Sequence, residues 1–368
     1  MLSTVLAERK EYCEKDGTYE HATLSKDGIY GKTERYNRDF LVSDENKAYK
    51  ITHRWDLCYN PANLKFGVIC LNTYGDAIFS PIYVTFDISE SFSKEFIGYA
   101  LSRWDFINRA LRFQQGTVYE RMAVSPEDFL TIHCRFPKLK EQEKIADFLR
   151  LIDQRIAKQS EHVEHLKKYK RGLLQAIFSR EVQLENLSNW EHRLFSEIAT
   201  LGKGKYTPKQ EEALHCIELE HLEQQTGQII GYANSNEQNS VKSVFHKGDV
   251  LFGKLRPYLR KFALPEYDGV CSSEIWVLHP ESNIDSTFLF YLIQSESFIA
   301  AANISSGTKM PRAEWSKVSN ESFFIPELSE QKRIADLFSA IDKRIVNASR
   351  SVNKMQSLKQ GLLQQLFI

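Results

Sequence analysis

Basic side chains gather at three places along a chain whose overall charge is balanced. The sequence has 48 Lys and Arg residues against 48 Asp and Glu residues, which excludes a polybasic nucleic-acid coat or an acidic disordered tail as its general character. Between residues 242 and 261, six basic side chains stand against one acid, Asp249. Smaller groups lie between residues 103 and 121 and after Gly307-Thr308. Lysine and arginine bind phosphates, and arginine, glutamine and asparagine read base edges, so these clusters indicate local contacts with duplex DNA.

Eleven residues have the types and the positions expected of such contacts. They are Lys254, Arg256, Arg260, Lys261, Lys309, Arg312, Asn60, Arg112, Gln114, Gln115 and Arg121. Aromatic side chains such as Tyr258 and Phe113 are interleaved with them. For any single residue a solvated charged surface is an equally open interpretation, because most charged side chains face water. The clusters taken together favour the DNA-binding interpretation.

No arrangement in the sequence favours catalysis or metal binding. The six cysteines include no C-x-x-C pair, and the ten histidines show no ligand spacing. The string Gly202-Lys203-Gly204 matches neither a phosphate-binding loop nor a dinucleotide fingerprint. Tyr59-Asn60-Pro61 lacks the second proline and the aromatic residue of the amino-methyltransferase motif. The sequence therefore predicts a chain with no catalytic residue, no metal and no cofactor.

The same composition predicts a cellular location. The scattered cysteines suit a reducing cytoplasm better than a disulfide framework. The apolar run at the N-terminus is too short for a signal peptide. No stretch approaches the roughly 18 uncharged apolar residues of a membrane-spanning helix. We therefore expect a cytoplasmic protein with no membrane partner.

The elements that must position the basic clusters are organised by an internal repeat. Residues 137–178 align without a gap with residues 326–367, and 19 of the 42 aligned positions are identical. The shared residues include the opening Pro-x-Leu-x-Glu-Gln-x-x-Ile-Ala at 137–146 and at 326–335. This similarity indicates a duplication within the chain.

Each copy of the repeat predicts one long helix. A proline opens it, no further proline follows, and apolar residues recur at alternating steps of three and four, as in Leu149, Ile152 and Ile156. Gln159, Lys170 and Lys359 interrupt this seam, and polar seam residues often fix register. We expect the two helices to pair as a coiled coil; the alternative is that each packs on its own globular domain. The matched Gly172 and Gly361 suggest a close backbone approach or a bend, or else a tolerated surface glycine.

The segments outside the helices are two arms of single-domain size. Asp56 to Tyr59 in the first arm corresponds to Asp249 to Phe252 in the second. Short β-type runs dominate both arms, and a helical stretch follows them at residues 93–112 and 286–302. We therefore predict two copies of one α+β domain, each leading into a long helix.

These motifs resemble the specificity subunits of Type I restriction–modification enzymes. The most specific parts are the two helix openings and the helix ends at residues 172–175 and 361–364, which both read Gly-Leu-Leu-Gln. The runs at 248–252, 256–257, 271–274 and 307–311 are similar to that family as well.

The resemblance implies an architecture and a role. The α+β chain would hold two similar target-recognition domains, at residues 1–136 and 179–325, each reading one half of a bipartite site in double-stranded DNA. Two long spacer helices, at 137–178 and 326–368, would form an antiparallel coiled coil with pseudo-twofold symmetry. The helices would set the spacing and dock two modification (methyltransferase) subunits. Restriction (motor-nuclease) subunits would complete the assembly, and the chain itself would catalyse nothing.

Two alternatives and one departure accompany this prediction. The chain could be a coiled-coil scaffold that binds no DNA, or the DNA-reading part of a modification enzyme that acts alone. The departure concerns the first arm: when Asp56 is aligned with Asp249, residue 1 stands opposite roughly residue 194. We therefore expect no clear counterpart of residues 190–193 in that arm.

Overall fold

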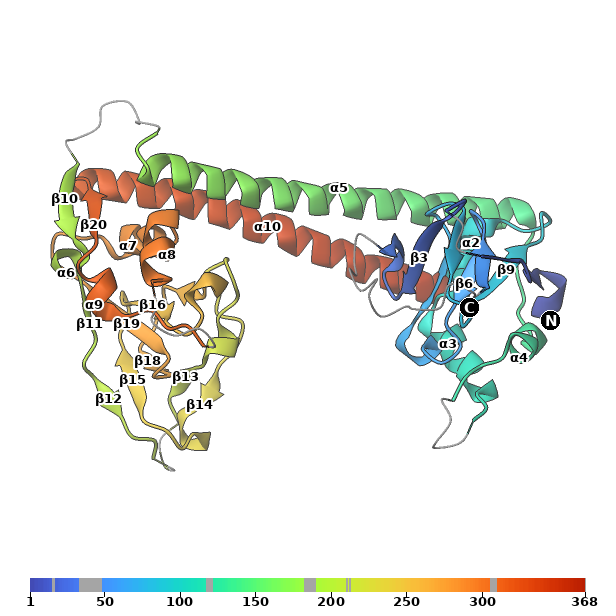
Figure 1. Ribbon diagram of the computed structural model, residues 1–368, viewed down its shortest axis with the longest axis horizontal. Helices are drawn as coiled ribbons and strands as arrows, with labels where there is room; N and C mark the ends of the chain where they lie inside the picture. Colours follow the sequence, from blue (N-terminus) through green and yellow to red (C-terminus); the bar gives the residue numbers. More distant parts are fainter. Residues whose placement is uncertain are drawn as a thin grey trace. The chain divides into compact units, whose positions relative to one another are not determined.

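The computed structural model describes residues 1–14, 17–32, 48–116, 122–181, 190–209, 211, 213–304 and 310–367. The chain forms two compact units. Unit 1 contains Met1–Lys158 and Ser351–Ile368, and unit 2 contains Gln159–Arg350. Each unit thus holds one arm and a part of both long helices (Figure 1). The division of the chain into arms at residues 1–136 and 179–325 and spacer helices at 137–178 and 326–368 stays a proposal.

The arm of unit 1 is built on two sheets. The first has the strand order β1-β9-β6-β7 and is antiparallel throughout. The second has the order β2-β5-β8-β3-β4, in which only β3 and β8 are parallel. The strands are β1 (Leu6–Glu8), β2 (Tyr12–Cys13), β3 (Glu20–Ser25), β4 (Gly28–Gly31), β5 (Tyr49–Thr52), β6 (Leu57–Tyr59), β7 (Ile69–Leu71), β8 (Ala77–Phe79) and β9 (Val84–Ile88).

Short helices cover the first sheet of unit 1. They are η1 (Leu2–Thr4), η3 (Leu64–Phe66), α2 (Lys94–Leu101), α3 (Trp104–Ala110), η4 (Leu111–Phe113) and α4 (Pro126–Thr131). Ser93 and Ser125 cap α2 and α4 by accepting hydrogen bonds from the amides of Phe96 and Asp128. The buried rings of Tyr59, Phe86 and Phe129 stack on one another with centroids 4.8 to 5.9 Å apart. Aromatic packing between the sheet and its helices therefore forms the main core of this arm.

The arm of unit 2 repeats this topology. Its first sheet has the order β11-β19-β16-β17 and its second the order β12-β15-β18-β13-β14, with β13 and β18 parallel. The strands are β11 (Ala199–Leu201), β12 (Lys205–Tyr206), β13 (His215–Ile217), β14 (Ala233–Asn234), β15 (Lys242–Phe245), β16 (Val250–Gly253), β17 (Phe262–Ala263), β18 (Gly269–Cys271) and β19 (Ile275–Pro280). The helices are α6 (Phe195–Ile198), η5 (Leu219–His221), η6 (Ser235–Glu237), η7 (Pro257–Leu259), α7 (Ser286–Leu292), α8 (Glu296–Ala302) and α9 (Trp315–Val318).

The two arms are therefore two copies of one α+β fold, as the sequence predicts. The correspondence reaches single hydrogen bonds. Asp56 accepts from the amide of His53 at 2.7 Å, and Asp249 accepts from the amide of His246 at 2.6 Å. Each aspartate closes the turn that leads into the central strand β6 or β16.

One element distinguishes the arms. In unit 2, β10 (Glu191–Leu194) pairs with β20 (Ser322–Ile325) in a two-stranded ribbon. Unit 1 shows no such ribbon among its described residues. The contact that follows the ribbon is present in both arms. In unit 2 the amide of Phe195 donates to the carbonyl oxygen of Glu321, and in unit 1 the amide of Leu2 donates to the carbonyl oxygen of Ile132.

The repeated segments form the long helices α5 (Leu139–Phe178) and α10 (Leu328–Leu366). In unit 2, Lys170 contacts Asp342, and Phe178 stacks on Phe338 with centroids 6.5 Å apart, so the end of α5 runs antiparallel to the start of α10. In unit 1, Asp153 contacts Lys359, and Phe367 joins the core that contains Ala146. The start of α5 is therefore antiparallel to the end of α10, which confirms the predicted pairing of the helices.

The repeated glycines do not mark a close approach of the backbones. A Cβ atom built at Gly172 or Gly361 would meet no atom within 4 Å. The prediction of a close approach is wrong, because both positions face open space. In the part of the chain that is described, no helix is both long and apolar enough to cross a lipid bilayer.

Candidate nucleic-acid interface

The basic cluster of the second arm forms one surface around the short helix η7. The amide of Arg256 donates to Pro311 at 2.8 Å, and the amide of Ala313 donates to Lys254 at 2.8 Å. These bonds join the segment 254–261 to the segment 310–313, which is distant in sequence. We call the two segments together the basic loop pair. The structure thus brings together five predicted residues: Lys254, Arg256, Arg260, Lys261 and Arg312.

The backbone of this surface is strained on both sides of η7. Arg256 and Arg260 both have φ of 52° and lie in the left-handed region, which residues with a Cβ atom adopt at a cost of about 1–2 kcal/mol each. Between them Tyr258 leaves 51% of its surface exposed. Strained residues cluster at functional sites, where the surrounding structure holds them in place. The result here is an exposed tyrosine beside an exposed arginine.

The side-chain environments of the five cations differ. Arg260 forms an ion pair with Glu296. Arg312 bonds to Glu274 through Nε at 3.0 Å, and this hydrogen bond raises the pKa of the guanidinium. Lys261 Nζ donates to the Leu219 carbonyl at 2.5 Å.

Lys254 and Arg256 have no side-chain hydrogen bond or ion pair with any described residue, and the side chain of Arg256 is exposed. No described side chain therefore binds these two cations, which leaves them able to contact a phosphate.

The candidates of the first arm are more dispersed. Arg112 is exposed on η4, beside the exposed Phe113. Gln114 Nε2 donates to Met122 at 2.8 Å, and Gln115 Nε2 donates to Asp128 at 2.9 Å. These two bonds fix the glutamine side chains to their own loop, and no described residue donates a hydrogen bond to their side-chain carbonyl oxygens, which can accept one. Arg121, and Lys309 in the second arm, lie outside the described residues.

Asn60 has a structural place in the first arm. It is only 5% exposed, and its Oδ1 accepts hydrogen bonds from the amides of Ala62 and Asn63 at 3.1 and 3.2 Å. A side chain that bonds to the backbone two and three residues on stabilises a turn. We therefore leave Asn60 out of the proposed contacts with DNA.

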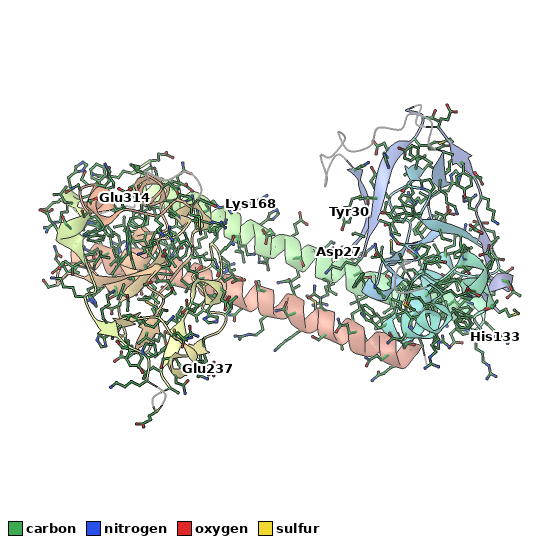
Figure 2. The ribbon with its side chains drawn as sticks, turned by 60° about the horizontal axis from the view of Figure 1, so that its bottom comes forward. Asp27, Tyr30, His133, Lys168, Glu237 and Glu314 are labelled. Atoms are coloured by element: carbon green, nitrogen blue, oxygen red, sulfur yellow. The ribbon has the colours of Figure 1, made fainter. Side chains whose placement is uncertain are left out.

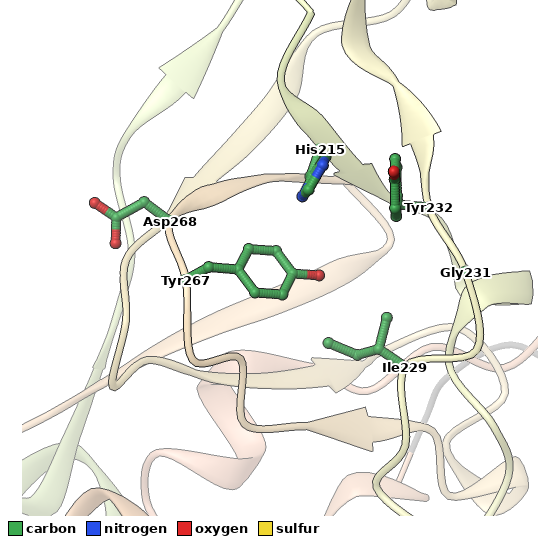
Figure 3. Close-up of a pocket in the computed structure, with 6 residues that line it drawn as sticks. All are labelled: His215, Ile229, Gly231, Tyr232, Tyr267 and Asp268. Carbon is green, nitrogen blue, oxygen red and sulfur yellow. The ribbon is translucent and has the colours of Figure 1, made fainter.

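An aromatic hollow on the second sheet of unit 2 was not predicted from the sequence. It has a volume of about 670 Å³ and is lined by His215, Ile229, Gly231, Tyr232, Tyr267 and Asp268 (Figure 3). The centroid of the His215 ring lies 4.0 Å from the ring centroid of Tyr232 and 5.5 Å from that of Tyr267. Burial raises the pKa of the Tyr267 hydroxyl, which stays protonated at neutral pH.

The carboxylate in the hollow is engaged elsewhere. Asp268 accepts a hydrogen bond from the amide of Lys247 at 2.8 Å and faces His246 at 3.3 Å. The bond from Lys247 is the main cause that lowers the pKa of Asp268. Three separate segments supply this hollow, so no local motif could have revealed it. Among the described residues, no group of three or more His, Cys, Asp or Glu side chains could hold a metal ion.

Comparison with known proteins is consistent with these arrangements. Residues 187–354 match the family model of the Type I restriction modification DNA specificity domain. The chain is 30% identical over 190 residues to the EcoDI specificity subunit of Escherichia coli, covering 49% of this chain and 42% of that protein. It is 24% identical over 274 residues to the MjaVIII specificity subunit of Methanocaldococcus jannaschii, covering 66% of this chain and 63% of that protein. The chain thus spans less than two thirds of the length of these relatives.

Solved structures show the same fold over the whole chain. The S subunit of a Type I restriction-modification system from M. genitalium matches with a TM-score of 0.60 at 16% identity, covering 100% of this chain and 95% of that chain. A chain from a study of complex assembly in the type I R-M system matches with a TM-score of 0.58 at 15% identity. The match covers 100% of this chain and 96% of that chain. Residues 187–354 thus match the DNA specificity domain of Type I restriction modification, and the chain is similar to specificity subunits of Type I restriction enzymes.

Proposed function

We propose that this chain reads a bipartite DNA target, each arm contacting one half-site, while the long helices set the gap and dock two modification subunits. The observation that carries the proposal is the identical strand order of the two arms. A duplicated reader on a duplicated helix suits a target with two separate halves. The match to a DNA specificity domain supports DNA as the ligand.

In the second arm, the basic loop pair is the proposed contact surface. Lys254 and Arg256 would meet phosphates or base edges, because no described side chain binds them. Arg260, Lys261 and Arg312 would hold the loop in shape through their bonds to Glu296, Leu219 and Glu274. Lys309 belongs to this proposal by its place in the sequence alone.

In the first arm, we propose contacts from Arg112, Gln114 and Gln115, with Arg121 included on sequence alone. Gln114 and Gln115 each donate one amide hydrogen bond to their own loop, so their carbonyl oxygens are the groups left to accept from an exocyclic amine. The two arms would therefore use different chemistry, which suits two half-sites of different sequence.

The helix pair carries the proposed docking surface. Tyr169 on α5 and Leu358 on α10 are 60% and 59% exposed, and they occupy equivalent positions of the repeat. Leu139 and Leu328, also equivalent, are exposed as well. Exposed apolar side chains that recur in a duplicated sequence fit two copies of one protein partner.

That partner would be the modification subunit, which would supply S-adenosylmethionine and methylate adenine, and restriction subunits would add ATP-driven translocation and cleavage. The chain would catalyse nothing and would act in the cytoplasm.

Methylation mapping tests the proposal. The full chain is expressed with the modification subunits of its host in cells that lack both, and methylated adenines are mapped across the genome. We expect sites that share two half-sites separated by one gap length, and no methylation when the chain is omitted. Methylation at a single uninterrupted site would contradict bipartite reading. Methylation by the purified chain alone would identify it instead as a self-sufficient enzyme.

A further inference from the structure

A lysine lies inside the helix seam of unit 2 and is bound on several sides. Lys170 of α5 is 6% exposed, and its Nζ lies 2.8 Å from Asp342 of α10 and 3.1 Å from Gln294 Oε1. The hydroxyl of Tyr291, on α7, donates to the same carboxylate of Asp342 at 2.9 Å. Lys170 also lies over the Tyr291 ring, 5.2 Å from its centroid. One cluster thus joins both long helices and the arm helix α7.

The same cluster recurs in unit 1 from the equivalent positions of the repeat. Lys359 Nζ lies 2.6 Å from Asp153 Oδ1, and the Tyr99 hydroxyl donates to Asp153 Oδ2 at 2.8 Å. Lys359 lies over the Tyr99 ring at 5.2 Å, the distance found in unit 2. Lys359 is half-buried, so this copy is the more exposed of the two. The arms have diverged, yet both retain a tyrosine on the helix that faces the cluster, which indicates a shared requirement.

The clusters discriminate between helix registers in a way that the aliphatic seam does not. Aliphatic side chains spaced by heptads fit a partner helix equally well after a slide of seven residues. Such a slide would move Lys170 from Asp342 to Ala335 or Ser349, and Lys359 from Asp153 to Ala146 or Ser160. Both slides would leave a lysine in the seam without a counter-ion, which is strongly disfavoured for a buried charge. The observed register is the one that pairs both lysines.

We propose that Lys170 and Lys359 are positioning residues that set the register of α5 against α10 and thereby the gap between the half-sites. Tyr291 and Tyr99 transmit that register to the arms, because each hydroxyl binds the carboxylate that pairs with the lysine. The inference rests on the proposed bipartite reading. It adds that the gap depends on two ion pairs within the helix seam, one buried and one half-buried, and not on helix length alone.

The test maps methylated sites, as above, for the full chain that carries both Lys170→Met and Lys359→Met. A slide of one heptad moves a helix by about 10.5 Å, or about three base-pair rises of 3.4 Å. We therefore expect unchanged half-sites and a second population of sites whose gap differs by about three base pairs. Lys168→Met is the matched control, since Lys168 is exposed on the same turn of α5 (Figure 2), and it should leave a single gap.

Two further variants make the outcome decisive. Exchanging the pair, as Lys170→Asp with Asp342→Lys, should restore the single gap in a chain that also carries Lys359→Met. If the double methionine variant does not fold, Lys170→Gln combined with Lys359→Gln carries the test and should also add the second gap. A single unchanged gap in every folded variant, with only a lower melting temperature, would overturn the inference. Failure of the proposed function would look different, because the unaltered chain would then yield no bipartite sites.

Discussion

Gln331 Oε1 accepts a hydrogen bond from the backbone amide of Asp285 at 2.8 Å, and this bond attaches the start of α10 to the N-cap of α7. The same side chain donates through Nε2 to the carbonyl oxygens of Asn283 and Pro326. In unit 1, Gln142 Oε1 accepts from the amide of Ser93 at 3.0 Å, and its Nε2 donates to Pro137. The glutamine of the repeated Glu-Gln motif therefore forms the hydrogen-bonded joint that attaches each long helix to its arm.

Replacing this joint should destabilise unit 2. Gln331 is 1% exposed, so Gln331→Leu would leave the Asp285 amide and two carbonyl oxygens buried without partners. We expect a loss of about 1–3 kcal/mol, measured by urea unfolding followed through tryptophan fluorescence, since Trp190, Trp276 and Trp315 all lie in unit 2. Gln175→Leu, at an exposed position of α5, is the control. Equal midpoints for both variants would show that the joint adds no stability.

Arg256→Gly should separate DNA binding from folding. Glycine adopts positive φ freely, so the fold should be unchanged or more stable by about 1 kcal/mol. DNA affinity should fall. The negative slope of log K against log salt concentration should become shallower by about 0.9 if the lost contact is one phosphate. Gln225→Gly is the matched control, because Gln225 is exposed and also has a positive φ, of 65°, but is not a proposed DNA contact. Binding and thermal unfolding are measured on each chain, and equal losses of affinity would argue against a special role for Arg256.

Lengthening both helices should widen the gap. We would insert seven residues in α5 between Asp153 and Lys170, and seven in the facing part of α10 between Asp342 and Lys359. A heptad keeps the seam in phase and adds about 10.5 Å, which corresponds to about three base pairs. Mapped sites should show that longer gap with the same half-sites. An unchanged gap would rule out the helices as the element that sets it.

Each of two single substitutions on the long helices should abolish binding of one modification subunit. Tyr169→Asp and Leu358→Asp each place a charge on an exposed apolar position, so folding should be unaffected. A carboxylate within a buried apolar interface is costly, so each variant should bind one modification subunit and the double variant none. Native mass spectrometry of the assembled complex counts the bound copies. Two bound copies in the double variant would locate the docking surface elsewhere.

Alkaline pH should weaken unit 2 through its buried thiols. Burial raises the pKa of Cys271 from 9.0 to about 12. In the unfolded chain this thiol ionises near its ordinary pKa, whereas in the folded chain it stays protonated. The stability that it contributes is therefore complete below pH 9 and is lost as pH rises toward 12. Urea unfolding at a series of pH values should show a steeper decline for the unaltered chain than for Cys271→Ala, and parallel declines would contradict the assignment.

The long helices, the duplication and the α+β class of the arms could be predicted from the sequence, because each depends on a local pattern of residues. Heptad spacing and a proline at the start determine the two long helices, and the identity between residues 137–178 and 326–367 reveals the duplication. The interruptions at Lys170 and Lys359 already pointed to register. The short β-type runs and the helical stretch after them were enough to predict two α+β arms.

Only the tertiary structure decided what the individual side chains do, because burial and hydrogen bonding depend on residues far away in sequence. Asn60 and Lys261 have types suited to DNA contact, but the first closes its own turn and the second binds the Leu219 carbonyl. Lys170 finds its counter-ion 172 residues away. The aromatic hollow joins residues 215, 229–232 and 267–268 through a sheet whose strand order cannot be read from the sequence. Residue type and spacing limit what a side chain can do, and the neighbours that the fold supplies determine which of these roles it takes.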